Sequence, residues 1–220
     1  MNIQSLGAGG RPRASRQQCA GAVLMIRPAA FDYNPETAET NKMQRSVGAE
    51  ASATTAAPGT DSAGTPQARA RAEFDGLVRA LHSEGVIVCQ VADTPEPPKP
   101  DAVFPNNWVS FHEDGTVVLY PMQAETRRRE RRQEIVAAVV SELGFQVSRV
   151  LDLTHHEAEG RFLEGTGSLI LDHVERVAYA SISPRTHPAV LEEWAHEMGL
   201  SPSSSKHSTE QACRSTIPTC

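Results

Sequence analysis

The stretch PDAVFPNNWVSFHEDGTVVLYPM, residues 100–122, carries the clearest structural signal in this sequence. Its two apolar runs, VFPNNWVSF and TVVLYP, flank the turn sequence EDG and predict a β-hairpin. A second stretch, RFLEGTGSLILD (161–172) followed by ERVAYASIS (175–183), predicts another hairpin around Asp172–His173. By direct count the two hairpins are about 60 residues apart, and each precedes an arginine-containing turn and a helix.

The segments around the hairpins complete a repeating pattern. Apolar runs predict strands, and apolar residues at helical spacing predict helices. The strands are expected at 21–26, 85–91 and 145–153, and the helices at 67–84, about 127–143 and 188–198. Recurrence of a β–β–α–β unit indicates a repeat architecture rather than a doubly wound sheet. The expected fold class is therefore α/β, built from repeated ββαβ modules.

Composition excludes several classes of partner. The chain has 220 residues, 39% of them hydrophobic and 22% charged, as in a globular domain. A net charge of −6 argues against nucleic acid, which usually requires a basic face. The one basic run, Arg127 to Arg132, is interrupted by Glu130, lacks aromatic residues and predicts a solvated helix face. No stretch approaches the roughly 20 apolar residues of a membrane span.

Cysteine and histidine usage predicts a cytoplasmic protein without a metal centre. The four cysteines have no regular spacing, which fits a reducing compartment and shows no zinc pattern. His155–His156 and His187 lack a supporting carboxylate pattern and are interpreted as surface or structural residues. Residues 1–20 and the stretch 46–66 are rich in small and polar residues that cannot bury a core.

The hairpin entrances carry the residues that could do chemistry. Asn106 and Asn107 are consecutive amides in an apolar run, where they need hydrogen-bond partners or an exposed β-bulge. Glu164 is followed by Gly165-Thr166-Gly167, and glycines at such a point permit the close approach of backbone or ligand. The carboxylate could orient a histidine, act in acid–base chemistry, or be an ordinary turn residue.

Several motifs in order resemble one enzyme superfamily. PDAVFPNNWVSF is similar to the PDxVFxED strand of dimethylarginine dimethylaminohydrolases and arginine deiminases. LEGTGSLILD resembles their EGGDVL motif, and YASISPRT their SxRT segment. VLMIRPAAF and YPMQAETRRRERR resemble the citrulline-hydrolase and amidinotransferase-like branch. The likeness spans about residues 21 to 200 and implies the α/β-propeller of the guanidino-modifying (pentein) superfamily, incomplete in this chain.

The resemblance implies a catalytic role for Glu164 and a substrate-binding role for six residues: Asp101, Asn106, Asn107, Arg127, Arg128 and Arg185. By position, Glu164 matches the carboxylate that partners a catalytic histidine, and Asp101 matches a substrate-binding carboxylate. Arg127 or Arg128, together with Arg185, match arginines that hold the substrate's α-carboxylate, which suits a forked guanidinium.

The two asparagines depart from the family pattern. Asn106 and Asn107 stand where arginine-cleaving relatives have acidic residues. Amide side chains pair better with a neutral ureido group than they do with a cationic guanidinium. This difference favours a citrulline-like substrate over an arginine-like one.

The end of the chain is expected to lack part of the catalytic apparatus. In the superfamily a cysteine attacks the amidino or ureido carbon and a histidine moves protons. After Gly199 the sequence loses periodicity, which predicts a disordered tail over residues 201–220. Codons read two nucleotides later allow a strand and a YHTN motif, so a frameshift near Leu200 is one hypothesis. With or without a frameshift, residues 21–200 are expected to form a partial domain of the superfamily, with the catalytic Cys and His missing from this chain.

The sequence leaves three alternative functions open. The leading one is hydrolysis of a C–N bond in a ureido or guanidino amino acid, without metal or organic cofactor. The second is an amidinotransferase, and the third is an inactive remnant that still binds the amino acid. The expected partner is a small amino-acid substrate, with no nucleic acid or membrane, and a homodimer as a candidate assembly.

Overall fold

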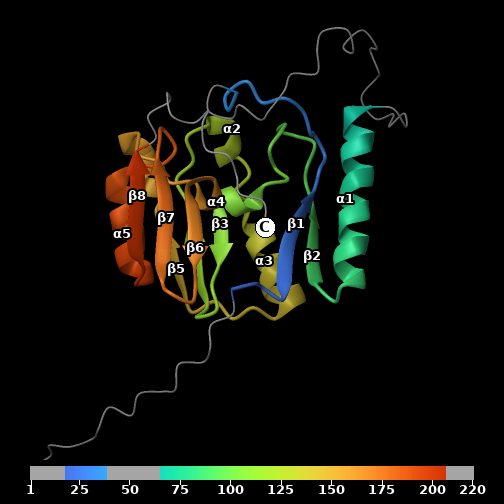
Figure 1. The fold of residues 1–220 in the computed structure, drawn as a ribbon. Helices are drawn as coiled ribbons and strands as arrows, with labels where there is room; N and C mark the ends of the chain where they lie inside the picture. Colours follow the sequence, from blue (N-terminus) through green and yellow to red (C-terminus); the bar gives the residue numbers. More distant parts are fainter. Residues whose placement is uncertain (1–17, 39–64, 207–220) are drawn as a thin grey trace, which may run out of the picture.

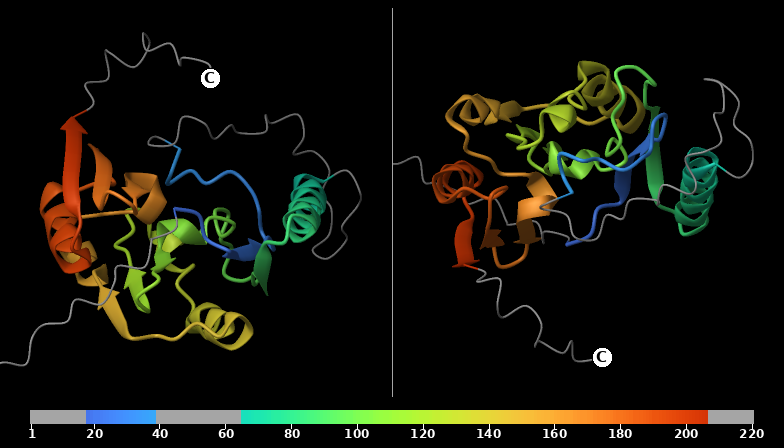
Figure 2. Two further views of the ribbon diagram at one scale, coloured as in Figure 1. Left: turned by 60° about the horizontal axis from the view of Figure 1, so that its bottom comes forward. Right: turned by 90° about the horizontal axis from the view of Figure 1, so that it is seen from above.

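The computed structural model describes residues 18–38 and 65–206. Within these residues, eight strands form three separate sheets. The sheets lie side by side around a common centre, and the longer helices cover their outer faces (Figures 1 and 2). None of the helices in the described ranges is long and apolar enough to cross a bilayer.

The first sheet pairs two strands through a helical crossover. β1 (Ala22–Arg27) and β2 (Ile87–Ala92) are parallel, and α1 (Pro66–Ser83) connects them. α1 begins where the Thr65 hydroxyl accepts a hydrogen bond from the Ala68 N–H at 3.1 Å, which satisfies one of the free N–H groups of the first turn. Phe74 is buried on the inner side of this helix.

The second sheet has three strands in the order β3–β4–β5. β3 (Val109–Phe111) and β4 (Thr116–Leu119) form an antiparallel hairpin, and β5 (Arg149–Asp152) lies parallel to β4. The hairpin turn requires glycine at residue 115. Gly115 has φ +81°, and a Cβ there would lie 2.5 Å from the Gln146 carbonyl oxygen.

The third sheet repeats this arrangement. β6 (Leu169–Asp172) and β7 (Val177–Ile182) are antiparallel, β8 (Ser201–Lys206) is parallel to β7, and α5 (Pro188–Met198) crosses between them. The two complete modules confirm the predicted ββαβ repeat. In the first sheet, β1 and β2 correspond to the central strand and the parallel strand of a module.

Two apolar cores hold the sheets together. One lies between β4, the third sheet and α5, and includes the fully buried Tyr120, Leu153 and Trp194. The other joins the first two sheets around Ile26 and Trp108. Because both cores draw on the second sheet, that sheet is the centre of the described structure.

The hairpin entrances differ from the strands that the sequence predicts. Pro105–Asn107 form a 3₁₀ turn, η1, instead of the start of a strand, and Gly165–Ser168 form the short helix α4. Pro105 lacks the N–H that a ladder would need, which favours a turn over a strand. Both elements lie immediately before the first strand of their module.

The helix predicted over about 127–143 is divided into α2 (Glu125–Arg128) and α3 (Gln133–Leu143). Arg132 is extended, with φ −116° and ψ 128°, and interrupts the helical path. The strand expected at 145–153 is reduced to β5. Between β5 and the next module lies a second 3₁₀ segment, η2 (Thr154–Glu159).

The start of the predicted disordered tail is ordered. Ser201–Lys206 form β8, in parallel register with Val177–Ile182. Backbone pairing to β7 explains this strand, since the side chains of 201–205 are exposed and contribute little apolar burial. Residues 207–220 lie outside the described residues, as do nearly all of the predicted N-terminal extension 1–20 and insert 46–66.

Candidate active site

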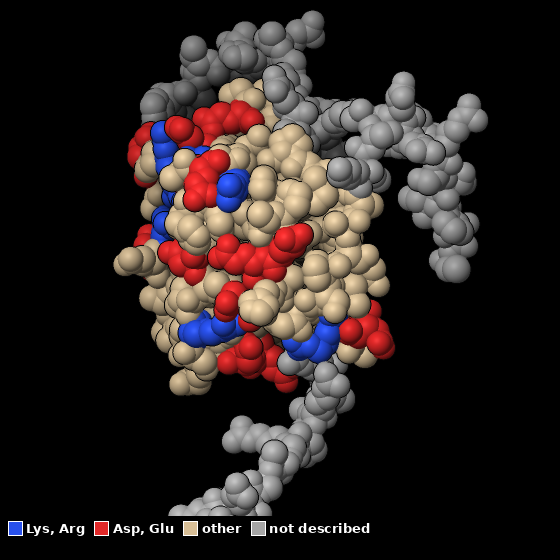
Figure 3. Space-filling view, turned by 90° about the vertical axis from the view of Figure 1, so that its left-hand side faces the viewer, with Lys and Arg blue, Asp and Glu red and all other residues tan. Residues whose placement is uncertain are grey.

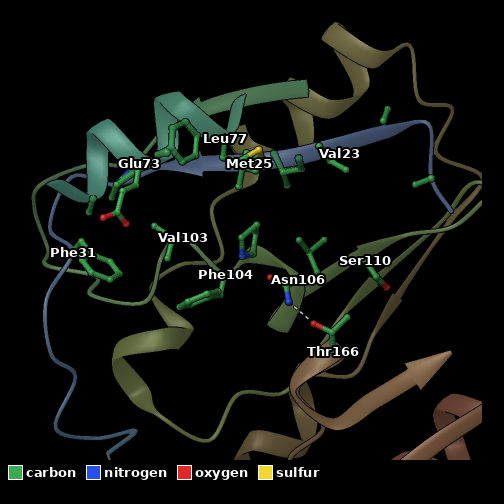
Figure 4. A pocket seen from close by; sticks show the side chains of 18 of the residues that line it. Val23, Met25, Phe31, Glu73, Leu77, Val103, Phe104, Asn106, Ser110 and Thr166 are labelled. Atoms are coloured by element: carbon green, nitrogen blue, oxygen red, sulfur yellow. Dashed lines mark hydrogen bonds between the residues drawn. The ribbon is translucent and has the colours of Figure 1, made fainter. Parts of the chain in front are cut away.

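The entrances of the two hairpins meet at the centre of the structure. Gly165 and Gly167 of α4 pack directly against η1: a Cβ at Gly165 would lie 2.2 Å from the Asn106 carbonyl oxygen, and one at Gly167 2.4 Å from Asn107 Nδ2. The Asn106 amide also donates a hydrogen bond to Thr166 Oγ1 (Figure 4). The two glycines predicted that backbone or ligand comes close here. In the structure it is the backbone of Asn106 and the side-chain amide of Asn107, both from the neighbouring module, that come close.

Glu164 lies at the start of α4 and is 1% exposed. Its Oε1 accepts a hydrogen bond from the Gln123 N–H at 3.0 Å, and its Oε2 is 3.4 Å from Arg185 Nη1. The Glu164 N–H is close to Ser168 Oγ, at 2.9 Å. This buried carboxylate therefore contacts the second module through Gln123 and the third through Arg185.

Asp101 is buried and precedes η1 by four residues. Its Oδ2 accepts hydrogen bonds from Asn34 Nδ2 at 2.8 Å and Thr37 Oγ1 at 3.2 Å, and lies 4.0 Å from Arg127 Nε. Asn34 and Thr37 follow β1, more than 60 positions earlier in the sequence. Sequence reasoning missed both, because nothing local links them to Asp101.

Arg127 is buried in a forked ion pair, which corrects the prediction of a solvated helix face. Its Nε and Nη2 each lie 3.0 Å from a carboxylate oxygen of Glu130, and Nη2 also donates to the Phe104 carbonyl at 3.0 Å. Burial alone would lower the pKa of Arg127, but the hydrogen bonds to Glu130 raise it above its ordinary value. Arg127 therefore supports the Asp101–Phe104 turn as a permanent cation.

Arg128 points to a different part of the site. Its Nε donates to the Met122 carbonyl at 2.9 Å and its Nη2 to the Gln123 carbonyl at 3.2 Å. Glu157 accepts a hydrogen bond from the Met122 N–H at 2.8 Å and forms a two-bond ion pair with Arg131, at 2.6 and 2.9 Å. The segment that contacts Glu164 is thus held by a polar cluster in which Glu157 and Arg131 were not predicted from sequence.

A broad apolar cavity of about 1060 Å³ opens beside η1. Figure 4 shows β1 and α1 along one wall, with Phe104, Asn106 and Thr166 on the opposite one. Among the seven residues proposed from the sequence, Asn106 lines this cavity. The other six, which are Asp101, Asn107, Glu164 and the three arginines, do not line it.

Two features define the class of fold. The ββαβ modules repeat with their longer helices outside, and the entrances of their hairpins meet beside the buried carboxylate of Glu164. The fold is the α/β fold of the guanidino-modifying (pentein) superfamily. The chain belongs to the family described as N,N-dimethylarginine dimethylhydrolase, eukaryotic, whose sequence model matches residues 27–213. No curated protein matches the chain.

Solved structures share this fold at low sequence identity. Dimethylarginine dimethylaminohydrolase from Pseudomonas aeruginosa, a C249S mutant complexed with citrulline, is 19% identical with a TM-score of 0.55; 86% of this chain and 61% of that chain are covered. The N-terminal domain of ArgZ, a cyanobacterial arginine dihydrolase, is 22% identical with a TM-score of 0.57, covering 86% and 59%. The chain thus spans about three fifths of the length of these two structures.

Proposed function

We propose that this chain supplies the substrate-holding part of a hydrolase site for a guanidino or ureido amino acid. The observation that carries the proposal is Glu164, a carboxylate that is 1% exposed and lies 3.4 Å from Arg185 at the meeting point of two modules. A buried carboxylate held by charge and backbone N–H groups is a frequent feature of catalytic sites. Family membership and the citrulline and arginine-dihydrolase neighbours support the same class.

Glu164 is suited to orient a catalytic histidine. Its Oε1 is engaged by the Gln123 N–H at 3.0 Å, whereas its contact from Oε2 to Arg185 is longer, at 3.4 Å. Oε2 is therefore the oxygen proposed to accept a hydrogen bond from an imidazole. In the mechanism that the family implies, a cysteine thiolate attacks the central carbon, and this histidine protonates the departing amine before water releases the product.

The proposed carboxylate-binding arginines are Arg185 and Arg128. Their side chains are 23% and 28% exposed, against 5% for Arg127. The fork of Arg127 is already directed at Glu130 and the Phe104 carbonyl. A substrate carboxylate would need a guanidinium with accessible N–H groups, which Arg127 does not offer.

Asn106 supports a neutral substrate head group. It stands in the cavity wall, and its amide is shared with Thr166 across the module boundary. An amide can both donate to and accept from a ureido group, and it brings no charge to neutralise a guanidinium. We therefore propose citrulline-like compounds as better ligands than arginine, with Asp101 and Asn107 holding the turn behind the amide.

Calorimetric titration of the chain with citrulline, arginine and a methylated arginine tests the proposal. Arg185→Ala is expected to weaken binding of the favoured amino acid at least about tenfold, because a charge-assisted contact is lost. Arg129→Ala is the matched control, since Arg129 is exposed and two residues from the buried Arg127. Equal affinity in both variants would contradict the assignment, and ammonia release from the same samples separates hydrolysis from binding alone.

A further inference from the structure

Two histidines and a glutamate converge outside the candidate active site. His155 and His156 lie in η2 of the second module, and Glu193 lies on α5 of the third. One ligand atom from each residue lies within 4.8 Å of the others. The tertiary structure thus supplies the carboxylate that the sequence around the two histidines lacks.

The hydrogen bond of the His155 ring leaves its Nε2 available to bind a metal. His155 Nδ1 is 3.2 Å from the Asp152 carbonyl oxygen, and only a protonated nitrogen can pair with a carbonyl. The neutral His155 ring therefore keeps its lone pair on Nε2. A backbone carbonyl that holds the other ring N–H in this way is the usual support of a metal-binding histidine.

His156 is 7% exposed and points Nε2 at Glu193 Oε2, 2.8 Å away. Among the described residues its buried Nδ1 has no hydrogen-bond partner, while Glu159 Oε2 lies 3.8 Å from it. A cation on Nε2 would place the ring proton on Nδ1, where Glu159 is a ready acceptor. A hydrogen bond from Nδ1 to Glu159 would then satisfy this buried nitrogen.

We infer that His155, His156 and Glu193 bind a divalent transition-metal cation such as Zn²⁺ and clamp η2 to α5. Imidazole and carboxylate are ligands of Zn²⁺, and atoms bound tetrahedrally at about 2.0–2.2 Å lie roughly 3.3–3.5 Å apart. Side-chain rotation of the exposed His155 and Glu193 can provide this adjustment. Several patches of Asp and Glu side chains lie on the face that α5 occupies, with Lys and Arg among them, and these patches favour the approach of a cation (Figure 3).

Isothermal titration with Zn²⁺ tests the site on the full chain. Each of His155→Ala and Glu193→Gln is expected to weaken Zn²⁺ binding at least about tenfold, and Glu159→Gln about tenfold through His156. Zn²⁺ is also expected to raise the melting temperature of the unchanged protein and not that of the double variant His155→Ala/Glu193→Gln. Glu192→Gln, the exposed neighbour on α5, is the matched control and is expected to behave as the unchanged protein.

Cobalt separates this site from binding at cysteines. Co²⁺ bound by nitrogen and oxygen ligands shows weak visible d–d bands, whereas thiolate ligation adds a strong near-ultraviolet charge-transfer band. The inference predicts the first spectrum and its loss in the double variant. Absence of Zn²⁺ binding, unchanged affinity in the double variant, or a thiolate band would each overturn it.

Discussion

Ser110, His112 and Tyr120 form a hydrogen-bonded chain beside the central sheet. Ser110 Oγ lies 2.8 Å from His112 Nε2 and 2.8 Å from the Tyr120 hydroxyl. Burial lowers the pKa of His112 to about 4; Asp114 opposes this shift, while His173 and Arg149 add to it. The folded protein therefore holds this imidazole neutral, as an uncharged hydrogen-bond partner of Ser110.

His112 makes stability depend on pH. Between pH 6.5 and 4 the unfolded chain binds a proton at this ring and the folded chain does not, so stability is lost as the pH falls. The loss is expected to reach on the order of 3 kcal/mol at pH 4. His112→Gln should flatten the dependence of the unfolding free energy on pH in urea titrations from pH 4 to 7. The same change at exposed His196 is the control, and an equally steep slope in the His112 variant would refute the prediction.

At the scale of elements, the contact between η1 and α4 organises the centre. Each element precedes the first strand of its module, and the two meet through backbone and amide groups. Gly165 permits this contact, since its φ is +30° and its position faces the Asn106 carbonyl. The placement of Asn106 and Glu164 therefore depends on a residue without a side chain.

Gly165→Ala is expected to destabilise the fold by about 2–3 kcal/mol, because the added methyl group would meet backbone that cannot rotate away. Gly76→Ala on α1 is the matched control. Its nearest atom is Arg79 Nη2 at 3.9 Å, and helix propensity predicts a gain of about 0.5–1 kcal/mol. Chemical unfolding of both variants measures the difference. Equal midpoints for Gly165→Ala and the unchanged protein would show that the junction is not tight.

At the scale of the whole molecule, a large apolar surface surrounds the cavity. Phe31, Leu77 and Phe104 line it and are 39%, 52% and 46% exposed. Among the described residues β1 pairs with β2 alone, so no strand lies along its other edge, beside this surface. Exposed apolar area next to an open strand edge promotes association.

Leu77→Lys is expected to reduce self-association and increase the soluble yield, because it places a charge in the cavity wall without removing a core contact. Val140→Lys, at an exposed position on α3 away from the cavity, is the control. Light scattering over a series of protein concentrations measures the effect. Identical scattering from the two variants would show that the cavity surface does not drive association.

Local signals explain which parts of the fold could be predicted. Apolar runs around EDG and Asp172–His173 predicted both hairpins, and apolar residues at helical spacing predicted the helix over 188–198, which is α5. The 3₁₀ turn at Pro105–Asn107 and the break at Arg132 were missed, because Pro105 and the contacts of the neighbouring arginines override the local strand and helix patterns. β8 was missed because its pairing to β7 comes from backbone groups and leaves no apolar pattern in Ser201–Lys206.

The sequence by itself determined the repeat of modules, the family and the set of polar residues at the hairpin entrances, since these depend on order and spacing along the chain. Only the tertiary structure decided which of them meet. It buried Arg127 against Glu130, brought Asn34 to Asp101 and Arg185 to Glu164, and carried Glu193 to the two histidines. The physical reason is that hydrogen bonds and ion pairs depend on distances of a few ångströms in space, which sequence separation does not record.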